Sequence, residues 1–410
     1  MSHITPKTPI TRPRFEIADV FRPNTHLLNG ITYEQWKVVN AIISCRTEKL
    51  GGHKLVCLDC GNEEISYNSC RNRHCPKCQG KDRMEWVEQR VKETLPIKYF
   101  HIVFTLPDIL NGLIQQNKKE MYEILFKAVG ETLNEAAKNP KNLGANIGFF
   151  SILHTWGQNL LDHPHIHCVV TGGGLNKEKT EWIKSRDNFF ISVKILGKLF
   201  RGKYLYYLKK LYEEGKLGFH GKMEVAGDEH GFNQLLTECY AKNWVVYSKK
   251  PFDDPIQVLK YLGRYTHRVA ISNSRIVNYS NGKVSFLWKD YRDKNKKKVM
   301  ILSVVEFMRR FLLHVLPKGF KRIRFYGILC NSYKKENLQI IRNILCKEGI
   351  LETSDQEIER SEYDSTMCPK CKSKNTYSVE IEPIKKINKT KWRDNKIHSE
   401  RCRAKSSNMA

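Results

Sequence analysis

Two histidines stand at a spacing that can build a metal site. His165 and His167 are two residues apart in the segment HPHIH, and alternate residues of a β-strand project from the same face. Two parallel imidazoles can bind one divalent cation, and His154 and Gln158 on the preceding segment are candidates for a third ligand. Alternating histidines also occur as ordinary polar surface residues, so this pattern alone leaves both interpretations open.

Two tyrosines show a second spacing of this kind. Tyr261 and Tyr265 are four residues apart, downstream of Asp254-Pro255, which is typical of a helix start. On a helix the two rings share one face, as an aromatic stripe in a core would. The cationic side chains interleaved with the tyrosines instead favour a helix that lies on phosphate groups; these predicted DNA-binding residues are Lys260, Arg264 and Arg268.

A third group consists of cysteines, six of which fall between residues 45 and 78. Two CxxC knuckles in this stretch have nearly the spacing of a zinc ribbon, and their four thiolates fill the coordination of a structural zinc ion. These predicted ligands are Cys57, Cys60, Cys75 and Cys78. Candidates for a second zinc ion interleave with them: Cys45, His53, Cys70 and His74. A further knuckle, Cys368 to Cys371, has no obvious partner.

The elements that must position these residues alternate between strands and helices. Residues 99–106 and 147–155 have the alternating pattern of strands, and residues 164–171, which carry the histidine pair, form another predicted strand. The three glycines at 172–174 predict a sharp turn after it. The histidines therefore lie on a predicted sheet, with Ile166 and Cys168 facing its core.

Composition and pattern divide the chain into four consecutive regions. Thr32 and Gln35 form a capping box that predicts a helix start, and the composition turns polar and basic after about residue 331. The predicted regions are an extended basic arm (1–30), a helical zinc-binding domain (31–96), a catalytic domain (97–330) and a basic C-terminal region with a CxxC knuckle, partly disordered (331–410).

The net charge of +27, from 70 Lys+Arg against 43 Asp+Glu, indicates a protein that binds a polyanion. No apolar stretch is long enough to span a membrane, and the first 20 residues have no apolar signal-peptide core. We therefore expect a cytoplasmic protein without a membrane partner, in which reduced cysteines bind metal.

Several segments, in the same order, resemble the rolling-circle insertion-sequence transposases of the IS91 family. The resemblance covers roughly residues 30–330, and the matching stretches are SCRNRHCPKCQ (69–79), YFHIVFTLP (99–107), LHTWGQNLLDHPHIHCVVTGGG (153–174), YLGRYTHRVAISN (261–273) and FLLHVLPKGFKRIRFYG (311–327). A His-apolar-His strand followed by a Tyr-x3-Tyr helix is specific to two-tyrosine transposases of the HUH group.

The resemblance implies an α+β protein with an HUH endonuclease fold, a central and mainly antiparallel sheet flanked by helices, preceded by a small zinc-binding domain. It implies that His165 and His167 hold the catalytic Mg²⁺ or Mn²⁺ and that Tyr261 and Tyr265 are the nucleophiles. The implied reaction nicks and joins single-stranded DNA at element ends and target through a 5′-phosphotyrosine. A bacterial, nucleoid-associated location and host replication proteins as partners also follow from it.

Two other functions fit part of the pattern. A plasmid replication initiator or a relaxase would use the same chemistry, but the cysteine cluster ahead of the histidine strand favours the transposase. A non-catalytic zinc-containing DNA-binding regulator would explain the charge and the cysteines. It leaves the histidine and tyrosine pairs without a role.

Overall fold

The computed structural model describes residues 13–186, 190–249, 263, 269–290, 293–349 and 366–384. The chain divides into two compact units, and each is built from separate stretches of sequence. The first contains residues 1–43 and 71–359, and the second contains residues 44–70 and 360–410. This division differs from the four consecutive regions expected from the sequence, because the C-terminal stretch joins a segment from near the N-terminus.

The centre of the first unit is a six-stranded sheet whose described strand pairs are all antiparallel. Its order is β11 (Ile323–Gly327), β4 (Asn146–Trp156), β5 (Asp162–Leu175), β3 (Tyr99–Thr105) and β7 (Val246–Ser248), with β6 (Trp182–Lys184) paired to the end of β5. The predicted α+β class with a central, mainly antiparallel sheet is confirmed. The three glycines expected to form a turn instead continue β5 to Leu175.

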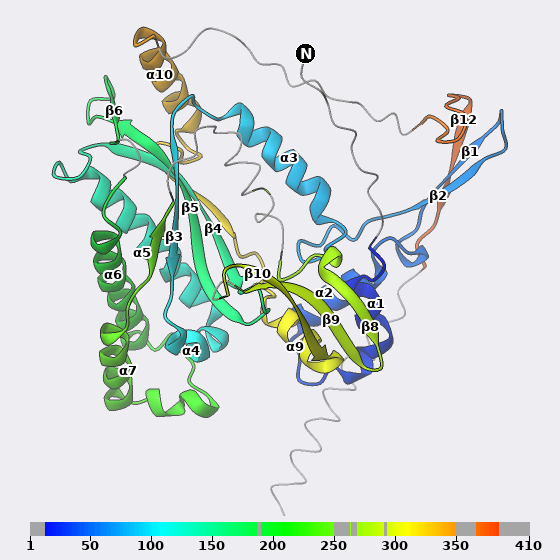
Figure 1. Ribbon diagram of the computed structural model, residues 1–410, viewed down its shortest axis with the longest axis horizontal. Helices are drawn as coiled ribbons and strands as arrows, with labels where there is room; N and C mark the ends of the chain where they lie inside the picture. The colour runs from blue at the N-terminus through cyan, green and yellow to red at the C-terminus, as the bar shows by residue number, and fades with distance from the viewer. Residues whose placement is uncertain are drawn as a thin grey trace, which may run out of the picture. The chain divides into compact units, whose positions relative to one another are not determined.

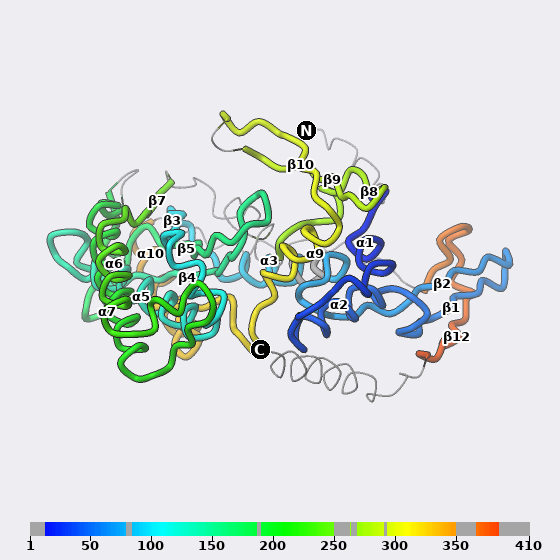
Figure 2. Tube along the Cα trace, turned by 90° about the horizontal axis from the view of Figure 1, so that it is seen from below, coloured from blue at the N-terminus to red at the C-terminus, as the bar shows by residue number. Residues whose placement is uncertain are grey.

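One face of this sheet is covered by helices. Alternate residues of β3 and β5, such as Phe104 and Ile166, are fully buried in one hydrophobic core with residues of the covering helices. These helices are α4 (Asn111–Gln116), α5 (Lys118–Lys138), α6 (Val193–Glu213) and α7 (Glu229–Ala241). Both views show α5, α6 and α7 grouped beside β3, β4 and β5 (Figure 1, Figure 2).

The opposite face of the sheet carries a smaller apolar cluster and the histidines. Tyr99, Phe150 and Val169 are buried there, and Trp86 of α3 (Gln79–Lys92) packs edge-on against Phe150 with the ring centroids 5.6 Å apart. Strand alternation therefore gives β3, β4 and β5 two different faces. One face is mainly apolar, and the other combines apolar residues with polar rings.

The rest of the first unit contains a second sheet and further helices. Helix α2 begins after the predicted capping box, because Thr32 and Gln35 exchange the two expected hydrogen bonds (2.8 and 3.2 Å). The elements are α1 (Ile17–Asn24), α2 (Tyr33–Ser44), β8 (Ile276–Ser280), β9 (Lys283–Asp290), β10 (Lys296–Ser303), α9 (Val304–Leu313) and α10 (Lys334–Lys347). The three strands pair in the order β10-β9-β8. Short 3-10 turns occupy Thr25–Leu27, Asp108–Leu110, Gly221–Ala226 and Asn273–Arg275.

The extended arm predicted for residues 1–30 is wrong where the structure describes it. Residues 17–24 form α1, with a capping box between Glu16 and Asp19. Its buried residues include Phe21, whose ring packs edge-on against Phe311 of α9 at 5.5 Å. The polar composition around it concealed a short amphipathic helix.

The second unit contains a three-stranded antiparallel sheet. Its order is β12 (Thr376–Ile381), β1 (Gly52–Cys57) and β2 (Glu63–Tyr67), preceded by a 3-10 turn at Glu48–Leu50. The orange β12 lies beside the blue β1 and β2 in both views (Figure 1, Figure 2). Strand β12 thus pairs with a strand more than 300 residues earlier in the chain.

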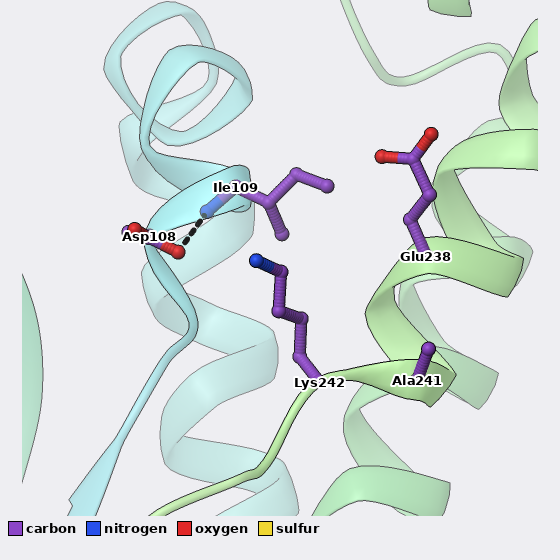
Figure 3. Close-up of a pocket in the computed structure, with 5 residues that line it drawn as sticks. All are labelled: Asp108, Ile109, Glu238, Ala241 and Lys242. Atoms are coloured by element: carbon purple, nitrogen blue, oxygen red, sulfur yellow. Dashed lines mark hydrogen bonds between the residues drawn. The ribbon is translucent and has the colours of Figure 1, made fainter.

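Two further features of the described residues are a surface hollow and the lack of a membrane-spanning helix. A hollow of about 410 Å³ is lined by Asp108, Ile109, Glu238, Ala241 and Lys242 (Figure 3). None of these residues belongs to the histidine or cysteine groups discussed below. Among the described residues, no helix is both long enough and apolar enough to cross a bilayer.

Candidate metal centre

The histidine pair lies on β5, the middle strand of the central sheet. Strands β4 and β5 pair with His154 opposite His165 and Ile152 opposite His167. Ile166 and Cys168 belong to the helix-covered core, as predicted, so the two histidines between and beside them project from the other face.

This register brings three imidazoles together. Each of His154, His165 and His167 offers a ring nitrogen, and these atoms all lie within 4.8 Å of one another. The ring centroids are 4.3 Å apart for His154–His167, 4.8 Å for His165–His167 and 5.4 Å for His154–His165. His154, one of the two candidates for a third ligand, therefore joins the pair. The other, Gln158, lies beyond the end of β4, where its backbone carbonyl accepts a hydrogen bond from Arg275 (2.6 Å).

The surroundings of the pair favour uncharged rings. Burial lowers the pKa of His165 to about 3, and the nearby His163 ring acts in the same direction. Burial also lowers the pKa of His167 well below its ordinary value, reinforced by His154 and His165. Both rings are therefore neutral at pH 7, which is the form that donates a lone pair to a cation.

Hydrogen bonds orient two of the rings. The Nδ1 of His165 donates to the backbone carbonyl of His163 (2.5 Å), which leaves Nε2 as its free ligand atom. The Nδ1 of His167 lies 2.7 Å from the Nε2 of His101 on β3, and the two rings are nearly parallel (9°). If a cation binds Nε2 of His167, its Nδ1 must carry the proton and donate it to His101.

The sequence motifs did not identify His101 as a site residue, although the strand pattern around it indicates which face it lies on. It lies in the alternating segment YFHIVFTL, and its side chain is 2% exposed. Residues Phe100, Ile102 and Phe104 face the helix-covered core, so Tyr99 and His101 must face the histidine side. The chemistry of these donors suits a divalent cation, because three imidazoles converge on one face of a rigid sheet.

The other predicted catalytic residues lie outside the described residues. These are Tyr261 and Tyr265, together with the predicted DNA-binding residues Lys260, Arg264 and Arg268. Their approach to the histidines stays a prediction.

Four cysteines come together, but they are not the predicted four. The sulfur atoms of Cys57, Cys60, Cys368 and Cys371, all in the second unit, lie within 4.8 Å of one another. The expectation that the first two CxxC knuckles share one ion is corrected: Cys57 and Cys60 lie beside the C-terminal knuckle, because β12 carries that knuckle to β1.

Neither candidate histidine belongs to this cysteine group. His53 is exposed on β1, opposite Ser66 and Glu380. His74 is buried, and its Nε2 accepts a hydrogen bond from the backbone amide of Leu316 (3.3 Å). Its Nδ1 therefore carries the proton and donates to Asn72 (3.1 Å). Burial lowers the pKa of His74 to about 3, so it is a neutral, hydrogen-bonded core histidine.

Comparison with known proteins gives the class and then the family. Residues 148–337 match the family model described as "Putative transposase", and residues 17–106 match the model of the transposase zinc-binding domain of IS91 elements. The "Putative transposase y4qJ" of Sinorhizobium fredii (strain NBRC 101917 / NGR234) is 45% identical, with 89% of this chain and 95% of the relative covered. The transposase for insertion sequence element IS801 of Pseudomonas savastanoi pv. phaseolicola is 27% identical, with 79% and 78% covered.

A metal-bound structure of the conjugative relaxase TrwC in complex with oriT DNA covers 62% of this chain and 95% of its own, at 11% identity. Its TM-score of 0.24 is too low to support a shared fold. The family assignment therefore rests on the sequence relatives and the family models. The chain is a transposase of the insertion-sequence type. It belongs to the IS91 family, with the zinc-binding domain of that family in its N-terminal part.

Proposed function

We propose that this transposase nicks and joins single-stranded DNA at element ends through a covalent 5′-phosphotyrosine, as rolling-circle transposition requires. The observation that carries this proposal is the convergence of His154, His165 and His167 on one face of the central sheet. A non-catalytic DNA-binding regulator has no need of three imidazoles arranged around one point.

The proposed roles follow from the geometry. The three rings would hold a divalent cation, Mg²⁺ or Mn²⁺, which would supply Lewis-acid polarisation of the scissile phosphate. His163 orients His165 through its backbone carbonyl, and His101 orients His167 through Nε2. The carbonyl acceptor fixes the tautomer of His165, and a cation on Nε2 of His167 would make His101 the acceptor of the His167 Nδ1 proton, so both Nε2 lone pairs would point away from the orienting bonds.

The nucleophile is a phenol hydroxyl. In the proposed reaction the oxygen of Tyr261 or Tyr265 forms a bond to phosphorus, and the bond from phosphorus to the 3′ oxygen of the leaving strand breaks. The tyrosine proton leaves its oxygen, and the departing 3′ oxygen gains a proton to become a free 3′-hydroxyl. The 5′ end stays linked to the protein as a phosphate diester, so the bond energy is retained for a joining step in which a 3′-hydroxyl displaces the tyrosine.

Binding of the strand is proposed to depend on the basic charge of the chain. The net charge of +27 suits counterion release from a nucleic-acid backbone. Lys260, Arg264 and Arg268 would contact phosphates beside the tyrosines. The DNA partner is proposed to be single-stranded at element ends and target, with host replication proteins and the nucleoid as the surroundings of the reaction.

The test is a search for the covalent adduct. The full-length protein is incubated with Mn²⁺ and labelled single strands that tile both flanks of its gene, and adducts are resolved under denaturing conditions and mapped by mass spectrometry. We expect an adduct on Tyr261 or Tyr265 that requires the metal. The matched control is Tyr247→Phe on the exposed part of β7, which should leave the yield unchanged. DNA binding without any adduct would support the regulator instead.

A further inference from the structure

The C-terminal CxxC knuckle lies outside both family-model matches, which cover residues 17–106 and 148–337. We call residues 57–60 the first knuckle and residues 368–371 the second knuckle. Although 308 residues separate Cys60 from Cys368, the two sulfur atoms lie 3.7 Å apart. Cys57 and Cys371 approach to 3.5 Å.

These separations match a thiolate-bound zinc ion. A tetrahedral site with zinc–sulfur bonds of about 2.3 Å places its sulfur atoms roughly 3.8 Å apart. Both measured pairs lie close to that value, and all four cysteines are free thiols. Four protein ligands complete the coordination, so an ion here has no open position for water and is structural.

The two knuckles have the same backbone conformation. In the first, Gly61 donates to the carbonyl of Cys57 (3.0 Å), and the amide of Cys57 donates to Asn62 (3.0 Å). In the second, Lys372 donates to the carbonyl of Cys368 (2.9 Å), and the amide of Cys368 donates to Ser373 (2.8 Å).

The residue after the second cysteine has a positive φ in both knuckles: +67° at Gly61 and +63° at Lys372. Glycine adopts this conformation freely, but lysine does so at a cost of about 1 kcal/mol or more. A strained residue at the position equivalent to Gly61 shows that the second knuckle is held in a specific shape by its surroundings.

Strands and side chains join the knuckles outside the cysteines. Strand β1 ends at the first knuckle and β12 starts after the second, and the two strands pair from Cys57 opposite Thr376 to Gly52 opposite Ile381. Asp59 of the first knuckle accepts hydrogen bonds from Ser373 (2.5 Å) and Asn375 (2.7 Å).

This small sheet buries few side chains of its own. All residues of β2 except Tyr67 are exposed, and β12 is exposed along its middle. Three short strands with so little apolar burial need another source of stability, which a bound metal supplies in many small domains.

We propose that the four cysteines of the first and second knuckles bind one structural Zn²⁺, which fastens residues 366–384 to β1 and completes a zinc ribbon from distant parts of the chain. The site is independent of the proposed DNA chemistry. Zinc binding here is coupled to folding of the ribbon, because the thiolates come from both stretches of sequence.

The test measures zinc in the full-length protein. The change Cys368→Ser/Cys371→Ser should remove one zinc equivalent per chain, and Cys57→Ser/Cys60→Ser should remove the same one. Combining all four changes should remove no more than either pair does, because both pairs serve one ion. The matched control is Cys330→Ser/Cys346→Ser, which alters two cysteines that belong to no candidate metal group among the described residues and should lose no zinc.

Two results would overturn the proposal: full zinc content in the Cys368→Ser/Cys371→Ser protein, or separate, additive losses from the two pairs. If these variants do not fold, the wild-type protein provides the same test. In that protein, chelation should expose the four knuckle cysteines to iodoacetamide together, and added Zn²⁺ should protect them together. Labelling of Cys368 and Cys371 that is indifferent to Zn²⁺ would refute the site.

Discussion

Replacing His101 tests whether a buried residue on β3 controls the metal centre. His101 is 2% exposed, and its Nε2 lies 2.7 Å from Nδ1 of His167. The change His101→Leu keeps a side chain of similar bulk but removes the acceptor. No bulk water reaches this position to replace it, so His167 would bind the cation with an unsatisfied buried N–H.

The expected loss can be stated as an affinity. Loss of an orienting hydrogen bond to a metal ligand typically weakens metal binding about 10- to 100-fold, or about 1.4–2.8 kcal/mol. That range agrees with the cost of about 1–3 kcal/mol for one unsatisfied buried donor. His101→Gln can place an amide oxygen near the position of Nε2, and it should recover most of the affinity.

The assay is a Mn²⁺ titration of the zinc-loaded protein, in which electron paramagnetic resonance measures free Mn²⁺. Nicking by His101→Leu should recover at high Mn²⁺, because the change weakens binding of the ion and leaves the nucleophile intact. Tyr99→Phe is the control: it removes a hydroxyl on the same strand face that accepts a hydrogen bond from Leu95 (3.1 Å). Wild-type Mn²⁺ affinity in His101→Leu, or equal losses in the leucine and glutamine variants, would refute the positioning role.

Three further changes have defined outcomes. The double change Tyr261→Phe/Tyr265→Phe should keep DNA binding but yield no covalent adduct. Each single change should block complete transposition in a mating-out assay. An adduct mapped to another residue would contradict the mechanism. Affinity for single-stranded DNA should fall more than about tenfold between 50 and 200 mM salt in a fluorescence-anisotropy titration. Each neutralised phosphate contributes about −0.7 to the slope of log affinity against log salt concentration, so a flat dependence would contradict phosphate-dominated binding. Hydrogen bonds from Arg309 and Arg310 lower the pKa of Glu306 to about 2; because the folded pKa is depressed, its contribution of about 1 kcal/mol is present above pH 4.5 and lost as the pH falls towards 2. Urea unfolding of Glu306→Gln should therefore differ from wild type at pH 7 and converge with it near pH 2, whereas Glu34→Gln, in an exposed pair with Lys37, should change little.

Local patterns predicted the elements on which the candidate site depends. Alternation in residues 164–171 is sufficient to place His165 and His167 on one face, because the period of a strand leaves no other arrangement. The capping box at Thr32 likewise marks the start of α2. Such signals involve residues a few positions apart, so they do not depend on the rest of the fold.

The three glycines of β5 show where a local signal misleads. A glycine run is typical of a turn, yet Gly172 and Gly174 lie within a strand. A Cβ on Gly172 would lie 2.7 Å from the carbonyl oxygen of Lys98, and one on Gly174 would lie 2.5 Å from that of Asn146. These residues are glycines because neighbouring backbone approaches closely, which only the assembled sheet reveals.

His101 was missed for a related reason. Its alternation with Phe100 and Ile102 placed it on the polar face, but a single histidine in a strand has no motif of its own. Its role depends on the diagonal offset between β3 and β5, where Val103, and not His101, is directly opposite His167. Strand register decides that offset, and register is a property of paired strands.

The cysteines show the same dependence on topology at a larger scale. Sequence proximity favoured pairing of the first two CxxC knuckles, since a short loop costs little entropy to close. The structure instead pairs Cys57 and Cys60 with cysteines at the far end of the chain. Loop-closure entropy grows only logarithmically, so 300 intervening residues add a modest penalty when most of them fold into a separate unit. The deciding term is then the pairing of β12 with β1, whose six-residue register brings the second knuckle beside the first. Spacing marked the CxxC knuckles as candidate ligands, and strand topology determined which knuckles lie side by side.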